Sequence, residues 1–384
     1  MDVTGLRIAI FSGNYNYVRD GANQALNRLV EYLLRKGAAV RIYSPTVADP
    51  AFPPNGEVVH VPAMSIPRRK EYKLPLMLSP RVRRDVREWR PNIVHVASPD
   101  IVSHRAVTLA RSIGVPVVAS VHTRFETYMR YYGLGFAEPV VLAILRRFYR
   151  RCDAIFAPSE SMAQLLREQR MNFDVGIWSR GIDRGIFNPA RRDMEWRRSL
   201  GIGDEVPAIG FVGRLVMEKG LDVFAETIDR VARRGVPHEV LVVGEGPARE
   251  WFEKRLPDAV FAGFAEGADL GRAVASMDML FNPSVTETFG NVTLEAMAAG
   301  LPVVAAIATG SLSLVADGVT GRLVRAGACE GFAEALAHYC QDGEARRRAG
   351  EAGERASRRY GWDEVNQELV DGYLRIVRQH GGAA

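Results

Sequence analysis

The chain alternates short apolar runs with amphipathic segments, and this alternation limits the fold more than any other feature. Apolar runs typical of buried strands occupy residues 7–12, 40–44, 93–97, 117–121, 154–158 and 175–178. Between them, leucine, valine and isoleucine recur at helical spacing, for example over residues 23–35 and 103–113. Strands that alternate with helices in this way predict an α/β fold with a doubly wound parallel sheet.

The pattern restarts in the second half of the chain. Strand candidates there are residues 208–212, 239–243, 260–261, 279–281, 302–305 and 321–324, and helices are expected at 221–234 and 292–299. The 384 residues leave room for two domains. We therefore expect two Rossmann-like domains facing a central cleft. The expected ranges are 1–188 for the N-terminal domain, 189–362 for the C-terminal domain, and 363–384 for a helix crossing back to the first domain.

Composition excludes several classes of protein. The three cysteines, Cys152, Cys329 and Cys340, form no CxxC pair, so neither a disulfide framework nor a zinc site is expected, and a reducing cytoplasm fits. No basic region with a small-residue cleavage site precedes the first strand, so we expect no signal peptide. No stretch of 18 apolar residues is free of charge, so any membrane contact should be peripheral.

The strongest candidate site is TETFGNVTLEAMAAG, residues 286–300. A helix that begins near Asn291 puts Glu295 one turn inside it and Glu287 in the preceding loop. Glu295 can then accept hydrogen bonds from a ribose diol, and Glu287 can reach sugar hydroxyls. Backbone N–H groups at this helix N-terminus suit a diphosphate. They belong to Phe289, Gly290, Asn291 and Val292. The plain alternative is an amphipathic helix with two solvated acids.

A second candidate is GRLVMEKG, residues 213–220, which directly follows an expected strand. Gly213 opens this loop, and Arg214 and Lys219 bracket it. Both cations can face one diphosphate, the first as a planar fork and the second as a point charge. Two solvated cations are the alternative. In open α/β sheets ligands bind at the carboxyl ends of strands, and this position favours the functional interpretation.

The first half of the chain offers weaker signals. His122 ends the apolar run 117–121, where it can be a structural residue or a hydrogen-bond partner for a sugar. Gly21 closes the loop SGNYNYVRDG after the first strand, which lacks the GxGxxG pattern, and no acid ends the second strand. This argues against a nicotinamide-dependent dehydrogenase. Walker, HExxH, GxSxG and DxD motifs are absent from the sequence, so we expect neither a metal nor a cofactor.

These motifs together resemble the retaining glycosyltransferases of family 4. The resemblance is carried by the spacing of Glu287 and Glu295, by residues 213–220, by VGEGP at 243–247 and by SVHT at 120–123. SRGIDRGIFNP at 179–189, together with TETFGNVTLEAMAAGLPVVA at 286–305, is most similar to the lipid-acceptor branch, the diacylglycerol glycosyltransferases and α-mannosyltransferases. The first loop departs from the family, because Asp20-Gly21-Ala22 stands where a Gly-Gly-Val turn is common.

The resemblance implies the GT-B fold and transfer of a hexose of the glucose, mannose or glucuronate type from a UDP- or GDP-linked donor, with retention and without metal. Glu295 would hold the ribose, and Glu287 the donor-sugar hydroxyls. Arg214 and Lys219 would neutralise the departing diphosphate, and His122 would contact the sugar. Three alternatives stay open: a soluble or polysaccharide acceptor, a non-hydrolysing nucleotide-sugar epimerase, and a catalytically silent nucleotide-sugar-binding protein.

Charge suggests where an acceptor could come from. Residues 1–190 carry a net charge of +11 and the remainder −6, and residues 64–90 alone hold nine cations against three acids. Leucines and methionines interleave with these cations, and a second basic cluster at 146–151 follows the apolar run 140–145. Such patterns suit the surface of an anionic membrane, and they predict a peripheral protein on the cytoplasmic side. We assign Arg68, Arg69, Lys70 and Lys73 to this membrane and acceptor side. A solvated basic face is the alternative. Nucleic acid is disfavoured by the sugar-nucleotide motifs.

Overall fold

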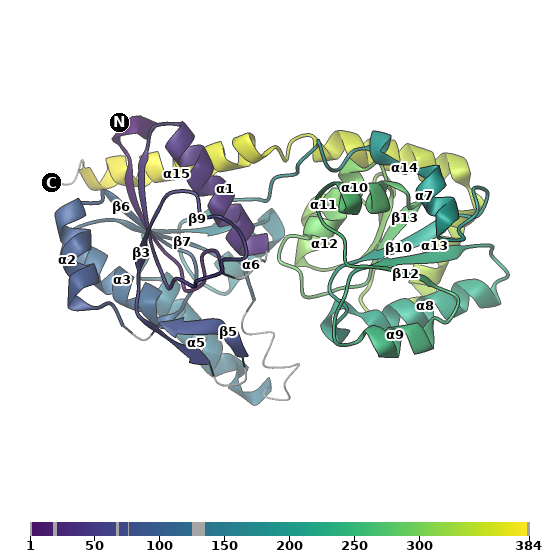
Figure 1. Cartoon of the computed structure of the whole chain (residues 1–384), viewed down its shortest axis with the longest axis horizontal. Helices are drawn as coiled ribbons and strands as arrows, with labels where there is room; N and C mark the ends of the chain where they lie inside the picture. The colour runs from purple at the N-terminus through teal and green to yellow at the C-terminus, as the bar shows by residue number, and fades with distance from the viewer. Residues whose placement is uncertain (1, 18–20, 67–68, 76, 125–134, 382–384) are drawn as a thin grey trace. The chain divides into compact units, whose positions relative to one another are not determined.

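The computed structural model describes residues 2–17, 21–66, 69–75, 77–124 and 135–381, and the chain divides into two compact units (Figure 1). Residues 1–181 and 362–384 form the first unit, and residues 182–361 form the second. The boundaries expected at 188/189 and 362/363 thus lie at 181/182 and 361/362. The reason is local: the Ile182 N–H donates to the Tyr360 carbonyl at 2.8 Å, and Arg184 pairs with Glu354, all within the second unit.

The first unit is built on a seven-stranded parallel sheet in the order β3-β2-β1-β6-β7-β8-β9. Its strands are β1 (Arg7–Phe11), β2 (Ala39–Ser44), β3 (Glu57–His60), β6 (Ile93–Val96), β7 (Val117–Ser120), β8 (Ala154–Ala157) and β9 (Val175–Ile177). A separate antiparallel hairpin joins β4 (Ala63–Ile66) to β5 (Arg69–Pro75). Its helices are η1 (Val3–Gly5), α1 (Gly21–Arg35), α2 (Pro80–Trp89), α3 (Ile101–Ser112), η2 (Gly135–Ala137), α5 (Glu138–Tyr149), α6 (Glu160–Glu168) and α15 (Trp362–Gly381).

Strand β1 shows why these runs are apolar throughout. Ile8 and Ile10 point to one face of the sheet and join a core with α1 and α15, whereas Ala9 and Phe11 point to the other, with α3 and α5. Because helices cover both faces, all positions of β1 after the exposed Arg7 are buried and no polar alternation remains.

Helix α15, drawn in yellow in Figure 1, belongs to the first unit although it follows the whole second unit in sequence. Its apolar face, including Leu369 and Tyr373, is part of the same core as α1. Polar contacts hold it there too, because the Tyr32 hydroxyl of α1 donates to Gln367. The helix therefore completes one face of a sheet formed by the other end of the chain.

The second unit has a six-stranded parallel sheet in the order β12-β11-β10-β13-β14-β15. Its strands are β10 (Ala208–Val212), β11 (Glu239–Val243), β12 (Val260–Gly263), β13 (Met279–Asn282), β14 (Val303–Ala306) and β15 (Gly321–Val324). Its helices are η3 (Pro189–Arg191), α7 (Met194–Ser199), η4 (Met217–Lys219), α8 (Leu221–Arg233), α9 (Arg249–Arg255), α10 (Gly267–Ala275), α11 (Asn291–Ala298), α12 (Thr309–Leu314), α13 (Cys329–Gln341) and α14 (Gly343–Ser357).

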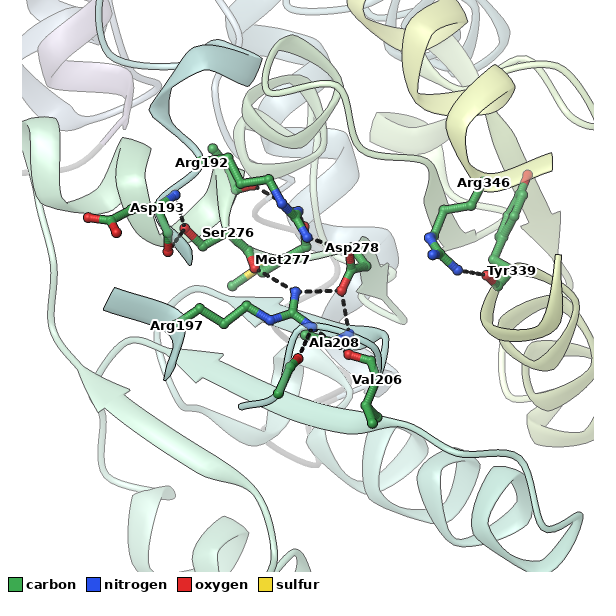
Figure 2. Close-up of polar contacts among 12 residues, drawn as sticks. Arg192, Asp193, Arg197, Val206, Ala208, Ser276, Met277, Asp278, Tyr339 and Arg346 are labelled. Carbon is green, nitrogen blue, oxygen red and sulfur yellow. Dashed lines mark hydrogen bonds and ion pairs between the residues drawn. The ribbon is translucent and has the colours of Figure 1, made fainter. Parts of the chain in front are cut away.

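A buried ion pair ties α7 to this sheet (Figure 2). The Arg197 side chain is 0% exposed, and its guanidinium donates to Asp278 Oδ2 at 2.6 Å. The same carboxylate accepts from the Ala208 N–H at 2.7 Å and from Arg192 at 2.7 Å. Asp278 precedes β13 and Ala208 opens β10, so one carboxylate joins the start of two neighbouring strands to the segment that leads into the unit.

Among the described residues, no helix combines the length and the apolar character needed to cross a bilayer.

Candidate active site

The loops after β10 and β11 are joined backbone to backbone. The Leu215 N–H donates to the Glu245 carbonyl at 2.9 Å, and the Gly213 N–H donates to Val243 at 3.0 Å. The approach leaves no room for a side chain, because a Cβ on Gly244 would lie 1.9 Å from the Gly213 oxygen. The loop that carries Arg214 is thus fixed by its neighbour rather than by its own sequence.

The two cations of this loop differ in their surroundings. Arg214 is exposed, and among the described residues its side chain makes no hydrogen bond or ion pair. Lys219, at the end of η4, lies 3.1 Å from Glu287 Oε1, with 30% of its side chain exposed against 15% for Glu287. The structure therefore brings together two predicted site residues from the loops after β10 and β13, and Arg214 stays available to a ligand.

Glu287 is held by its backbone as well as by Lys219. Its carbonyl accepts from Thr309 Oγ1 at 2.8 Å and from the Gly310 N–H at 3.0 Å, both at the start of α12. Its carboxylate Oε2 is buried and has no hydrogen-bond partner among the described residues. A buried acceptor without a donor is costly, and a ligand hydroxyl would satisfy it.

The α11 N-terminus lies next to this carboxylate. Gly290, the residue before α11, has φ = +95°, and a Cβ there would lie 3.3 Å from Glu287 Oε2. Asn291 and Val292 begin the helix, so their N–H groups are among those without a partner inside it. The Phe289 side chain is buried and packs edge-on against Tyr360, with ring centroids 5.8 Å apart. Phe289 can therefore contact a ligand only through its backbone N–H, because its side chain is buried.

Glu295 lies in the second turn of α11, as expected. It is partly buried, and burial followed by the charge of Glu287 raises its pKa to about 7. Two carboxylates that share a low-dielectric region resist being ionised together. The site thus combines an acid that can be neutral near physiological pH with an acid that is paired to Lys219.

His122 lies in the first unit, after β7, and both of its ring nitrogens are engaged there. Nε2 lies 2.8 Å from Ser120 Oγ, and Nδ1 lies 2.6 Å from the Arg180 guanidinium. Burial and the charge of Arg180 hold the pKa of His122 well below its usual value. A sugar hydroxyl could reach a ring nitrogen only by replacing one of these partners, which the sequence did not indicate.

The other predicted residues of the first unit are less informative. Gly21 is the first residue of α1. Arg68 lies outside the described residues, and for Arg69 and Lys70 the description covers only their place in β5. Lys73 is partly buried in the same strand.

Sequence reasoning missed the residues that hold the predicted ones in place. Thr309 follows β14, so the rule that ligand loops lie at the carboxyl ends of strands could have indicated it. Ser120 lies two residues before His122, so the two-residue repeat of a strand could have indicated it. Arg180 could not have been assigned to His122, because that contact depends on tertiary structure. Among the described residues, no group of three or more His, Cys, Asp or Glu side chains could hold a metal ion.

Two family models match the chain. Residues 19–185 match the model of glycosyltransferase family 4, and residues 206–342 match that of glycosyl transferases group 1. A GDP-mannose-dependent α-mannosyltransferase of Mycolicibacterium smegmatis is 34% identical over 97% of this chain and 98% of its own. The sulfoquinovosyl transferase of Arabidopsis thaliana is 31% identical over 93% and 71%. An α-monoglucosyldiacylglycerol synthase of Streptococcus pneumoniae is 22% identical over 78% and 71%.

Solved structures share the fold across the whole chain. The sucrose-phosphate synthase of Thermosynechococcus elongatus superposes with a TM-score of 0.79 over 99% of this chain and 100% of its own, at 20% identity. The Anabaena protein HepE, solved with UDP-glucose, gives 0.71 over 96% and 100%, at 18% identity. The two parallel-sheet units are thus those of a GT-B fold. With these matches and the site of its second unit, the chain belongs to glycosyltransferase family 4.

Proposed function

We propose that this glycosyltransferase moves a hexose from a nucleotide sugar to a lipid acceptor, with retention of configuration and without metal. The observation that carries the proposal is the polar cluster of the second unit. There the buried Glu287 Oε2, which has no partner in the part of the chain that the structure describes, lies beside Lys219 and the α11 N-terminus. An orphaned acceptor next to a cation and free N–H groups suits a ligand that offers hydroxyls and phosphate together.

The proposed chemistry is stabilisation of the leaving group. As the bond to the anomeric carbon breaks, negative charge grows on the diphosphate and the sugar becomes oxocarbenium-like. Arg214, Lys219 and the N–H groups of α11 favour that state over the ground state. Glu287 and Glu295 are assigned to sugar and ribose hydroxyls and not to nucleophilic attack. Retention then follows from attack on the same face within an ion pair.

Relatives guide the choice of donor and acceptor. The mycobacterial relative is named for GDP-mannose, and the streptococcal one for a glucosyldiacylglycerol product. We therefore test GDP-mannose and UDP-glucose first, against a membrane lipid extract, and identify the product by mass spectrometry. Release of nucleoside diphosphate that depends on the extract supports the proposal. Release with only water-soluble glycans would support a soluble acceptor. Epimerised donor would support the epimerase, and no turnover the silent binder.

Transfer is expected to persist in excess chelator, because Arg214, Lys219 and backbone N–H groups supply the positive charge. Initial rates with and without chelator measure this. Complete loss of activity that magnesium or manganese restores would contradict the assignment.

Nucleotide affinity is expected to increase with pH through the pKa of Glu295. A ribose diol donates to the ionised carboxylate, and with the pKa raised to about 7 ionisation rises roughly tenfold per pH unit below that value. Calorimetric titration of GDP and UDP near pH 6 and pH 8 measures the change. In Glu295→Gln only the titration of the phosphate itself should remain. The same pH dependence in this variant would remove Glu295 from ribose binding.

Two surfaces of the first unit support peripheral contact with an anionic membrane. On the first, Phe136, Val140 and Ile144 are 81%, 60% and 55% exposed, and their spacing of four places them along one face of η2 and α5. Arg147 is exposed on the same face. On the second, α2 buries two valines and exposes Arg81, Arg83, Arg84 and Arg87. Apolar side chains beside arginines suit the headgroup boundary of the cytoplasmic leaflet.

Liposome flotation tests this contact. Binding should need anionic lipid, weaken with salt, and fall at least about tenfold when Arg68, Arg69, Lys70 and Lys73 are changed to Gln together. The matched control removes four exposed cations of the second unit: Arg233, Lys254, Arg347 and Arg348. Equal flotation on neutral and anionic vesicles would remove the electrostatic contact.

A further inference from the structure

A chain of buried polar side chains runs through the first unit behind His122. Tyr373 Oη of α15 lies 2.7 Å from His95 Nδ1, and His95 Nε2 lies 2.8 Å from Ser120 Oγ. Ser120 contacts His122, and His122 contacts Arg180. Tyr373, His95 and Ser120 are at most 1% exposed, and Arg180 is 6% exposed. Such a row of polar groups in a core is expensive unless each group finds a partner.

Arg180 determines the protonation of His122. A guanidinium has N–H donors and no acceptor, so His122 Nδ1 must accept from it at 2.6 Å. The ring proton of neutral His122 therefore lies on Nε2 and is donated to Ser120 Oγ. Ser120 can in turn donate its own hydrogen to His95 Nε2, which places the His95 proton on Nδ1, facing Tyr373.

Packing around this row of hydrogen-bonded side chains further restricts the His122 ring. Trp178 is 1% exposed and lies edge-on to both His122 and His95, with centroids 5.5 and 5.9 Å away. Its indole N–H donates to Asn366 of α15 at 3.2 Å, and the Arg180 guanidinium lies over its ring at 5.3 Å. One tryptophan thus fills the space between both histidines, Arg180 and α15.

We propose that Arg180 is a positioning residue that holds His122 as the neutral tautomer protonated on Nε2, while Ser120 of β7, His95 of β6 and Tyr373 of α15 support the ring from its other side. His122 then serves as a fixed hydrogen-bonding group of the first unit and takes no part in proton transfer. The purpose of this arrangement rests on the proposed function, but the tautomer itself does not.

Nitrogen-15 NMR of the histidine rings tests the tautomer in the full-length protein without any substrate. The seven histidines give separable ring patterns, and His122→Gln identifies the one of interest. We expect an unprotonated Nδ1 and a protonated Nε2. A His122 that carries its proton on Nδ1 in the wild-type protein overturns the proposal, whatever the variants show.

Variants of Arg180 test the cause. Arg180→Lys retains a side chain that can only donate, so the Nε2–H tautomer should persist. Arg180→Gln can donate or accept, so both tautomers should appear. Transfer from GDP-mannose or UDP-glucose should then lose about tenfold to a hundredfold in kcat, with a smaller change in donor KM, and Arg180→Lys should recover part of it. A single tautomer in Arg180→Gln, with unchanged kcat, would overturn the role of Arg180.

Tyr373→Phe tests the end of the hydrogen-bonded row of side chains that lies farthest from Arg180, with Tyr43→Phe as its matched control. Tyr43 is as buried as Tyr373, but its hydroxyl contacts Asp85 instead of the histidines. Tyr373→Phe should broaden or split the His122 ring signals and lower kcat, while Tyr43→Phe should leave both as in the wild type. Equal behaviour of the two folded variants would remove Tyr373 from the network. If neither donor binds, the proposed function fails, but the tautomer result stands.

Discussion

Replacing Arg214 or Lys219 with alanine is expected to lower turnover by about 10²–10³-fold while the protein stays folded. Each substitution removes a cation that would stabilise the negative charge growing on the diphosphate in the transition state. Arg214 should give the cleaner result. It is exposed and makes no ion pair among the described residues, so its loss leaves no buried group unsatisfied. The expected loss is therefore in kcat, with little change in thermal stability.

Lys219→Ala has a second consequence. It also removes the partner of Glu287 Oε1 at 3.1 Å, so both oxygens of a buried carboxylate would lack a partner. Adding Glu287→Gln to Lys219→Ala separates the two roles: the double variant should recover stability but not turnover.

Lys254→Ala is the matched control for the two cations. Lys254 forms a surface pair with Glu250 and is 74% exposed, so turnover should be unchanged. Single-turnover rates of donor consumption measure all of these variants. Near-normal rates in both folded alanine variants would remove the two cations from the mechanism.

The second large effect concerns stability. Asp278→Asn should destabilise the second unit by about 3–5 kcal/mol, because it leaves the Arg197 guanidinium buried without a counter-charge. The Arg197 side chain is 0% exposed, and its Nε has no hydrogen-bond partner among the described residues, so solvent cannot replace the lost counter-charge. Urea unfolding followed by hydrogen exchange of β10 and β13 amides resolves this unit from the other.

The matched control is Asp204→Asn. Both carboxylate oxygens of Asp204 accept from Arg198, in a pair with 56% and 39% side-chain exposure, and such exposed pairs contribute about 0–1 kcal/mol. An equal, small loss in both variants would show that the buried pair adds nothing beyond a surface pair.

At acid pH the wild-type protein and Asp278→Asn should have the same free energy of unfolding. Burial alone would raise the pKa of Asp278, but Arg192, the Ala208 N–H and Arg197 together hold it below its usual value. A carboxyl with a lowered folded-state pKa contributes its full stability above the unfolded value of about 3.9 and loses it as the pH falls further. Unfolding curves across this range measure the loss. A difference that persists at the lowest pH would contradict it.

The sequence predicted most of the central strands, because burial on both faces makes them continuously apolar. The strands at 208–212, 239–243 and 321–324 have the expected bounds. The strand β3 and the β4–β5 hairpin were not predicted. They carry charged and polar residues, and β3 lies at the edge of its sheet with one side unpaired, so neither periodicity nor apolar content distinguishes them from loop.

The residues of the candidate site also divide into those that sequence could predict and those that it could not. Glu287, Lys219 and the start of α11 could be predicted because each follows a core strand and the strands are parallel. The Arg180 partner of His122 could not be predicted. Ser120 is a local neighbour two residues away, but Arg180 lies 58 residues further along the chain, and only tertiary packing brings it to His122.

The place of α15 has a consequence for biosynthesis. Residues 1–181 leave the ribosome long before the helix that covers Leu26, Leu29 and Tyr32. At about 5–20 residues per second, roughly ten to forty seconds of translation separate the two. During that interval the second unit is made and can fold without α15, while the face of the first sheet that α15 covers has only α1 on it. The first unit therefore begins to emerge first but is completed last, after the second unit.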